Sequence, residues 1–341
     1  MLVDEFISYI AGVRRYSART GSIYADVLDE FRRFAAGDGT DIDDEMLISA
    51  LTRTVIRNYE YHLASERKLS ARTINQHLSV LSRFCRWLMV TGRLKSNPVK
   101  LVKRPKCEKR LPEFYREESM QKYFRDTSYE ADEESAEELM SVSSSAHYGA
   151  AAGESAGKRL EELYDARLRR LIISILYETG MRRAELISLQ VTGIDFSRAI
   201  ITVTGKGDKM REIPMTSSLS SEISLYLKAA ESVAGRKKAP GDPLLTTFGG
   251  RALYPMFVDR AVKKELGTVD DITGKKSPHV LRHTLATELL NDGADIYSIK
   301  ELLGHSSLAA TQVYTHNTIE KLKKVYNNAH PRAKRGGKNG D

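Results

Sequence analysis

The sequence has little cysteine and no long apolar run. Its two cysteines, Cys85 and Cys107, form no Cys-x-x-Cys pair, so neither a disulfide framework nor a paired-cysteine metal site is expected. No apolar run approaches the ~20 residues of a membrane-spanning helix, and the first residues lack the pattern of a secretory signal. We therefore expect a soluble protein in a reducing compartment.

Acidic residues do not balance the basic ones, and they are unevenly placed. The 341 residues carry a net charge of +8, yet seven carboxylates and no Lys or Arg lie between Asp126 and Glu138. Without these seven charges, the net charge of the remaining chain rises from +8 to +15. Such an excess favours a phosphate-lined partner, although a basic protein that binds no nucleic acid would have the same balance.

A chain of this length suits two domains, and residues 1–98 are expected to form a helical one. Helices are indicated from Asp4, around 20–36, around 52–66 and after Ser70. The last is the clearest, because Ser70 is a suitable N-cap and apolar residues follow at spacings of three and four. Those apolar residues are Ile74, Leu78, Leu81, Cys85 and Leu88.

The opposite side of this last helix is polar and has no carboxylate between Ala71 and Val90. Its side chains are of the types that contact phosphates and base edges. They are Arg72, Thr73, Asn75, Gln76, Arg83 and Arg86. We expect this side to face DNA, and the alternative is a solvated polar face.

Residues 99–111 have the composition of a basic linker. Prolines at 98, 105 and 112 interrupt the segment, and its cations include Lys103 and Arg104. We expect these cations to lie along a phosphate backbone, and the alternative is a tether that only aids solubility.

Residues 112–341 are expected to form a second domain that is mainly helical. Ile194–Met215 is the strong strand signal, and it predicts a hairpin with a glycine-rich turn. The segment near 126–160 is acidic and then rich in Ser, Ala and Gly, so a flexible insertion is expected there. The predicted fold class is therefore mainly α with a small β-sheet.

Two cations of the second domain stand beside glycines. Arg182 follows a helix end at Gly180, and a guanidinium there is able to bind two phosphate oxygens. Lys206 lies between two glycines at the hairpin tip, where it is able to reach and protonate a leaving oxygen. Considered singly, each is more simply explained as a surface cation, so the inference depends on the whole set of residues.

A further helix is predicted to begin at Ser277-Pro278, the pattern of an N-cap and first helical residue. This start places His279, Arg282 and His283 on one helical face. An imidazole beside a fixed guanidinium suits phosphate activation, while a structural role suits His283. No Glu stands in a His-Glu-x-x-His arrangement, so a zinc site is not expected.

The nucleophile candidate is Tyr314, nine residues after His305. A tyrosine nucleophile needs a cationic pocket that favours the phenolate and stabilises the charge of the transition state. The two arginines, Lys206 and the histidines would supply that pocket. Fixed cations would then replace Mg²⁺ in phosphoryl transfer, and no metal or other cofactor is expected.

Several long motifs of the second domain resemble those of one enzyme family. They are Thr-Gly-Met-Arg-Arg-Ala-Glu-Leu (179–186), Gly-Lys-Gly-Asp-Lys (205–209), Pro-His-Val-Leu-Arg-His-Thr-Leu-Ala-Thr (278–287) and the segment from Leu-Leu-Gly-His to Val-Tyr-Thr-His (302–316). The chain resembles the tyrosine recombinase/integrase family, Xer type, with its XerC- and XerD-like members. The likeness extends over nearly the whole length.

The resemblance implies an N-terminal helical core-binding (SAM-like) domain and a catalytic domain with the DNA breaking-rejoining fold. It implies that two arginines grip the scissile phosphate, a lysine protonates the departing 5′ oxygen, and a tyrosine attacks to form a 3′-phosphotyrosyl bond. One histidine would assist proton transfer and the other would bind the phosphate. The implied catalytic set is Arg182, Lys206, His279, Arg282, His305 and Tyr314.

The resemblance also implies the partners. Double-stranded DNA would be bound by four protomers on two sites, with strand exchange through a Holliday junction and with the tail after about Thr318 docking on a neighbouring protomer. A second Xer-type recombinase and a DNA translocase are possible additional partners, and no membrane partner is expected. A nucleoid partner would place the protein in the cytoplasm.

Three readings of function stay open. Dimer resolution, mobile-element integration and DNA inversion would share one strand-exchange chemistry, and the segment near 126–160 leaves the choice among them open. A DNA-binding repressor derived from an integrase would bind without cleaving. A type IB topoisomerase would relax supercoils without needing paired sites.

Overall fold

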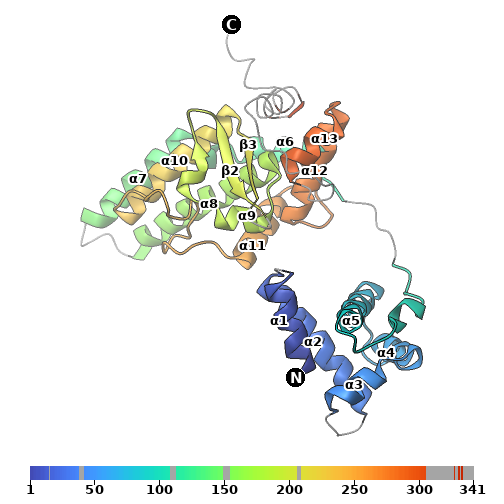
Figure 1. Cartoon of the computed structure of the whole chain (residues 1–341). Helices are drawn as coiled ribbons and strands as arrows, with labels where there is room; N and C mark the ends of the chain where they lie inside the picture. The colour runs from blue at the N-terminus through green and yellow to red at the C-terminus, as the bar shows by residue number, and fades with distance from the viewer. Residues whose placement is uncertain are drawn as a thin grey trace. The chain divides into compact units, whose positions relative to one another are not determined.

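The computed structural model describes residues 1–14, 16–37, 42–107, 113–148, 154–205 and 209–304, together with Tyr326, Ala329, His330 and Arg332. The chain divides into two compact units, Met1–Arg110 and Leu111–Asp341, each with its own hydrophobic core (Figure 1). Among the helices of these described ranges, none combines the length and the apolar character needed to cross a lipid bilayer.

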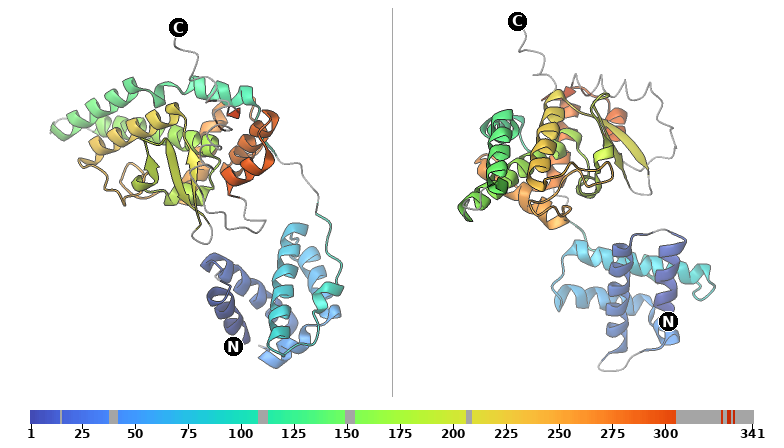
Figure 2. Two further views of the ribbon diagram at one scale, coloured as in Figure 1. Left: turned by 45° about the horizontal axis from the view of Figure 1, so that its top comes forward. Right: turned by 90° about the vertical axis from the view of Figure 1, so that its left-hand side faces the viewer.

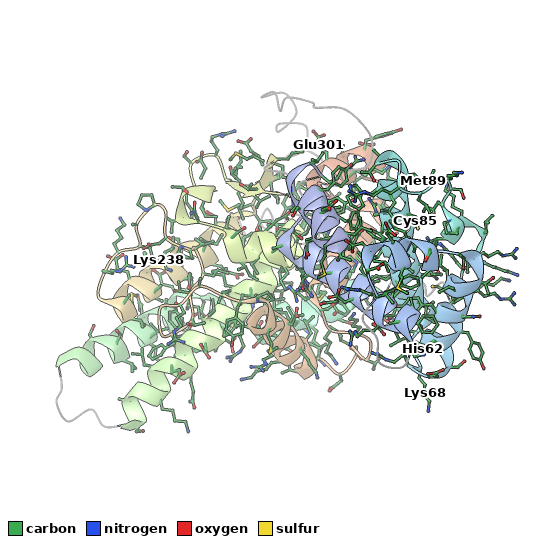
Figure 3. The ribbon with its side chains drawn as sticks, turned by 60° about the horizontal axis from the view of Figure 1, so that its bottom comes forward. His62, Lys68, Cys85, Met89, Lys238 and Glu301 are labelled. Atoms are coloured by element: carbon green, nitrogen blue, oxygen red, sulfur yellow. The ribbon has the colours of Figure 1, made fainter. Side chains whose placement is uncertain are left out.

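The N-terminal unit is a bundle of helices. In chain order they are α1 (Leu2–Gly12), α2 (Ala18–Ala36), α3 (Asp44–Ala50), α4 (Arg53–Ser65), α5 (Ala71–Val90) and the 3₁₀ turn η1 (Pro98–Leu101). The predicted N-cap of α5 is confirmed, because the Ser70 hydroxyl accepts a hydrogen bond from the Thr73 N–H at 3.3 Å. The apolar face of α5 is buried, and Leu78, Leu81 and Cys85 have no exposed surface. Cys85 is labelled in Figure 3.

Two segments of this unit differ from the sequence expectations. Helix α3 was not predicted; Asp43 caps it by accepting a hydrogen bond from the Met46 N–H at 2.8 Å. The segment expected as an extended linker from residue 99 begins instead as part of the bundle, because Val99 and Val102 are buried in its core. The apolar side chains of η1 therefore fix the start of the linker to α4 and α5.

The C-terminal unit is built around one long helix. Its elements are α6 (Glu117–Asp126), η2 (Tyr129–Ala131), α7 (Glu133–Tyr148), α8 (Glu154–Thr179), α9 (Arg183–Ser188), η3 (Val191–Gly193), β1 (Ile194–Asp195), β2 (Ile200–Thr204), β3 (Met210–Pro214), α10 (Ser217–Ala234), α11 (Pro255–Glu265), η4 (Leu266–Thr268), α12 (Pro278–Asn291) and α13 (Ile296–Leu303). Residues 171–181, the last turns of α8 and the bend after it, are all buried. Helices α10, α11 and α12 pack against α8, so the last turns of α8, which are buried on every side, lie at the centre of the core.

The small sheet predicted from the sequence is confirmed. Strands β1, β2 and β3 form an antiparallel sheet in that order, and β2 pairs with β3 from Ile200↔Pro214 to Thr204↔Met210. Ile201 and Ile213 point into the core from these two strands. The hairpin turn between them joins Gly205 to Lys209, whose carbonyl accepts from the Gly205 N–H at 2.7 Å.

The segment expected to be a flexible insertion is instead largely helical. Helix α7 packs against both α8 and α10, and the three helices lie side by side in Figure 2. Leu139 is fully buried in the core, and the buried Ser143 hydroxyl donates to the Ser232 carbonyl at 3.0 Å. The expectation was wrong because composition alone hid a sparse apolar stripe, Ala136, Leu139 and Val142, at helical spacing.

Candidate active site, an arginine centre

A glycine turn after α8 positions the first candidate residue. Gly180 has a φ of +58°, and a Cβ at this position would lie 2.6 Å from Leu303 Cδ2 and 2.9 Å from Leu285 Cδ2. Only glycine suits both the left-handed backbone and the close approach. The turn leads to Arg182, the N-cap of α9, whose backbone N–H donates to Glu185 Oε2 at 2.8 Å.

The Arg182 guanidinium has two protein partners and retains access to solvent. Its Nη1 donates to Glu185 Oε1 at 2.8 Å, and its Nη2 donates to the Gly304 carbonyl at 2.7 Å. The side chain is 42% exposed, whereas Glu185 is 4% exposed. A buried carboxylate therefore orients a guanidinium whose remaining surface is open to a ligand.

Arg282 reaches the same place from α12. Its Nη1 donates to the Gly180 carbonyl at 2.7 Å and its Nη2 donates to the Leu303 carbonyl at 2.5 Å. Burial, and then the positive charges of Arg182 and Arg211, lower the pKa of Arg282 to about 10. The side chain stays charged at neutral pH. Burying this charged guanidinium near two other arginines costs free energy, which indicates a site prepared to bind an anion.

Arg211 is a third arginine of this cluster, and it was not predicted from the sequence. It lies on β3, is 5% exposed, and donates from Nη1 and Nη2 to the two oxygens of Glu185 at 2.9 and 2.8 Å. Burial raises the pKa of Glu185, but the hydrogen bonds from Arg211 and Arg182 lower it to about 2. Strand alternation was the available signal, since Arg211 points the same way as the buried Ile213.

We call Arg182, Arg211, Arg282 and Glu185 the arginine centre. Three guanidiniums and one carboxylate give this cluster a surplus of positive charge. Its members come from the start of α9, from β3 and from α12, and its partners Leu302, Leu303 and Gly304 form the end of α13. Figure 1 shows α12 and α13 adjacent to each other in this unit.

The histidines of α12 lie close to each other at the start of that helix. Nε2 of His279 is 3.1 Å from Nε2 of His283, and His279 is exposed. Burial, followed by the charges of His283 and Arg282, lowers the pKa of His279. The predicted helix start at Ser277-Pro278 is confirmed, but the Ser277 hydroxyl makes no capping bond.

Lys206, His305 and Tyr314 lie outside the described residues. The residues directly before two of them are described and lie at the arginine centre. A Cβ on Gly205 would be 3.6 Å from Glu185 Oε1, and the Gly304 carbonyl binds Arg182. The described residues therefore bring the chain to this one place directly before Lys206 and directly before His305.

The predicted DNA-facing residues of the N-terminal unit fall into two groups. Arg72, Gln76 and Lys103 are exposed, and Thr73 accompanies Ser70 in the N-cap of α5. The others make contacts within the unit: Asn75 Nδ2 donates to the Pro105 carbonyl at 2.9 Å, and the exposed Arg104 and Arg83 donate to Ser79 Oγ at 2.8 Å and to the Tyr16 hydroxyl, respectively. Asn75 thus holds the linker, a role that the sequence analysis did not foresee.

The described residues of the tail bind their own unit in this single chain, and the docking on a neighbour that the resemblance implied stays a prediction. Arg332 forms ion pairs with Glu178 and, at 2.9 Å, with Glu222. The Tyr326 hydroxyl donates to the Glu178 carbonyl at 3.0 Å, and the His330 ring stacks on Tyr326. The Arg332 guanidinium pairs with the buried carboxylates of Glu178 and Glu222, which explains why these residues bind their own unit in the single chain.

Comparisons with known proteins agree with this architecture. Residues 156–321 match the Phage integrase family, and residues 2–91 match the N-terminal SAM-like domain of phage integrases. The chain is 32% identical over 336 residues to tyrosine recombinase XerC of Chlorobaculum parvum, covering 97% of this chain and 94% of that protein. It is 34% identical over 338 residues to tyrosine recombinase XerC of Bacillus pumilus, covering 97% of each.

Solved structures share the fold. One is the XerH site-specific recombinase bound to its difH substrate, with a TM-score of 0.58 and 19% identity, covering 92% of this chain and 81% of that one. Another is a lambda integrase tetramer bound to a Holliday junction, with a TM-score of 0.57 and 15% identity, covering 92% and 79%. The family matches and the two relatives place the chain: it belongs to the tyrosine recombinase family, Xer type, and is an enzyme of site-specific DNA recombination.

Proposed function

We propose that this chain cleaves and rejoins double-stranded DNA through a 3′-phosphotyrosyl bond at Tyr314. Arg182 and Arg282 bind the non-bridging oxygens of the scissile phosphate. The observation that carries the proposal is their convergence from α9 and α12 on one place, the end of α13. Guanidiniums held before the substrate arrives stabilise the charge of the transition state without reorganising.

The proposed chemistry is a transesterification. The Tyr314 oxygen attacks phosphorus and the bond from phosphorus to the 5′ oxygen breaks, while the phenolic proton passes to His279. Lys206 gives a proton to the departing 5′ oxygen, and His305 hydrogen-bonds the phosphate. The reverse attack by a 5′ hydroxyl of a second duplex restores a phosphodiester, and because the covalent bond conserves its energy, no ATP is required.

Two observations support the participation of Lys206, His305 and His279. Gly205 and Gly304 lie at the arginine centre, and Lys206 and His305 follow them directly in the chain. His279 is exposed beside buried Arg282, and the lowered pKa of this histidine favours the neutral imidazole that accepts a proton.

We also propose that the enzyme works as a tetramer on two DNA sites and exchanges strands through a Holliday junction, as the lambda integrase tetramer is bound to one. In that assembly the tail would leave its contacts with Glu178 and Glu222 of its own chain and would make the same contacts on a neighbouring protomer. A second Xer-type recombinase and a DNA translocase are proposed additional partners, and the nucleoid is the proposed location. Arg72, Gln76, Arg83, Lys103 and Arg104 would contact DNA, because they are exposed cations and amides.

A nicked suicide substrate tests the proposal. On it, the unsubstituted chain should accumulate a covalent protein–DNA adduct, because the short fragment beyond the cleaved bond diffuses away. Tyr314→Phe should bind the same site with unchanged affinity and form no adduct. An undiminished adduct with Tyr314→Phe would refute the assignment, and a two-site plasmid assay would separate recombination from simple relaxation.

A further inference from the structure

Three consecutive carbonyls at the end of α13 each accept a hydrogen bond from a different arginine. The Leu302 carbonyl accepts from Arg211 Nε at 3.0 Å. The Leu303 carbonyl accepts from Arg282 and the Gly304 carbonyl from Arg182, at 2.5 and 2.7 Å. The last carbonyls of a helix have no partner within the helix and carry its negative dipole end, so they are natural acceptors for cations.

The three arginines are not equivalent. Arg182 is 42% exposed and Arg211 is 5% exposed. Arg211 donates from all three of its nitrogens, to Leu302 and to both oxygens of Glu185. Arg282 donates to two backbone carbonyls. Each guanidinium carries five N–H donors, so Arg182 and Arg282 are suited to receive a phosphate, and Arg211 is suited to hold protein.

We propose that Arg211 is a positioning residue of the reaction: it fixes Glu185, and through it Arg182, to the end of α13 without touching DNA. This inference rests on the proposed function of Arg182 and Arg282. Arg211 joins the two parts that must stay in register, the carboxylate that orients one phosphate-binding arginine and the helix end from which the chain continues to His305 and Tyr314.

We call this link from Glu185 through Arg211 to Leu302 the clamp. It is needed because a bound phosphate competes for the donors of Arg182 and Arg282. Phosphate oxygens are stronger acceptors than neutral carbonyls, so DNA binding weakens the bonds from Arg182 to Gly304 and from Arg282 to Leu303. The Arg211 bond to Leu302 is not part of that exchange. It keeps the end of α13 in place while the other two arginines share their donors with the substrate.

The close packing around Gly304 supports the clamp. A Cβ at Gly304 would lie 3.1 Å from both Cδ and Nη1 of Arg211, and Gly304 has a φ of +64°. The guanidinium therefore lies directly against the backbone at the helix end. A lysine at position 211 would keep the positive charge but lose the planar fork that binds two carboxylate oxygens and a carbonyl at once.

The test compares DNA affinity with the rate of adduct formation on the nicked substrate at saturating protein. Arg211→Lys should lower that rate by roughly 10- to 100-fold, the cost of a small misplacement of reacting groups, and change DNA affinity by less than about threefold. The matched control is Arg198→Lys, because Arg198 makes a two-point pair with Glu212 at the exposed side of the same sheet. Arg211→Lys cleaving within twofold of the control would overturn the inference.

A double substitution separates positioning from charge balance. In Glu185→Gln/Arg211→Met no buried charge is left without its partner, so thermal stability should equal or exceed that of Glu185→Gln alone, which leaves the buried Arg211 without its carboxylate. The double variant should still form the adduct about tenfold more slowly than Glu185→Gln. Equal rates would mean that Arg211 only neutralises Glu185, and the inference would be wrong. Absence of any adduct from the unsubstituted chain would instead overturn the proposed function itself.

Discussion

The two units of this chain use arginine in opposite ways. On α5, Arg72 and Arg86 are exposed, on a helix whose opposite face forms the core. In the arginine centre, Arg211 and Arg282 are 5% and 6% exposed, and each is bonded to backbone carbonyls or to Glu185. The same side chain is a movable surface cation in one unit and a fixed structural donor in the other.

The difference indicates how the two units divide recognition and chemistry. Exposed arginines neutralise phosphates along a duplex and release counterions, which gives affinity that depends on salt. Buried arginines have already lost solvation and side-chain freedom, so they add little affinity but stabilise one charged geometry strongly. Removing a fixed arginine should therefore change rate more than affinity, and removing an exposed one should do the reverse.

The largest effect is expected for Arg282→Ala. The rate of adduct formation should fall by roughly 10³-fold, the upper range for loss of one preorganised donor. Loss of the guanidinium also leaves the Gly180 and Leu303 carbonyls without their partner. Quantifying the adduct on a nicked substrate, with Arg236→Ala as an exposed-arginine control, measures this effect, and a loss of less than about tenfold would contradict the contrast between the two units.

A buried carboxyl on α12 should give the next largest effect, on stability. Glu288 accepts from the Tyr177 hydroxyl at 3.0 Å, and burial raises its pKa to about 8 although the Tyr177 bond lowers it. The folded chain keeps this proton while the unfolded chain loses it, so this group should make stability fall as pH rises from about 4.5 to 8. Glu288→Gln should remove that fall and raise the free energy of unfolding at pH 8 by about 1–3 kcal/mol.

Chemical denaturation at pH 5 and pH 8 checks this prediction. Glu137→Gln, on the exposed face of α7, serves as the control for replacing a carboxylate. Equal pH dependence in the Glu288→Gln variant and the unsubstituted chain would show that this buried carboxyl is ionised in the folded state.

Asn75 is a partly buried polar residue, and replacing it should have an intermediate effect on stability. Its side-chain amide holds the linker through the Pro105 carbonyl, so Asn75→Ala should lower the free energy of unfolding by about 1 kcal/mol. Gln76→Ala, one residue along and exposed, should change it by less than about 0.5 kcal/mol. Urea titrations of both variants test whether Asn75 stabilises the fold. Identical unfolding midpoints for the two variants would contradict this role and leave Asn75 among the residues predicted to face DNA.

The smallest effect is expected for Arg72→Ala. DNA affinity should fall by roughly three- to tenfold, and the slope of log affinity against log salt should become shallower by about 1. Fluorescence anisotropy at several salt concentrations measures both quantities. An unchanged slope would remove Arg72 from the proposed contacts and would weaken the division between the units.

Local patterns let the sequence predict α5, the hairpin and the start of α12. Ser70 caps α5 through Thr73, Gly205 pairs with Lys209 across the hairpin turn, and Pro278 is the first residue of α12. The short helix α3 and the packed helix α7 were missed, because α3 is one cap and one buried leucine, and α7 hides a narrow apolar stripe within a polar composition.

The candidate site was predictable only as a set of residue types. Arg182 and Arg282 were identified, but their shared partner at the end of α13 depends on contacts 122 and 21 residues away in the chain. Arg211 was missed because its partners, Glu185 and Leu302, lie 26 and 91 residues away. Nothing local in the sequence encodes such contacts, apart from the strand alternation that turns Arg211 inward.

The most direct test of the proposed chemistry is to identify the residue that carries the DNA. The chain contains 16 tyrosines, so the adduct from a nicked substrate should be digested with protease and nuclease and sequenced by mass spectrometry. We expect a nucleotide 3′-phosphate on Tyr314, lost in Tyr314→Phe. A nucleotide attached to any other residue would contradict the proposed nucleophile and the pocket built around it.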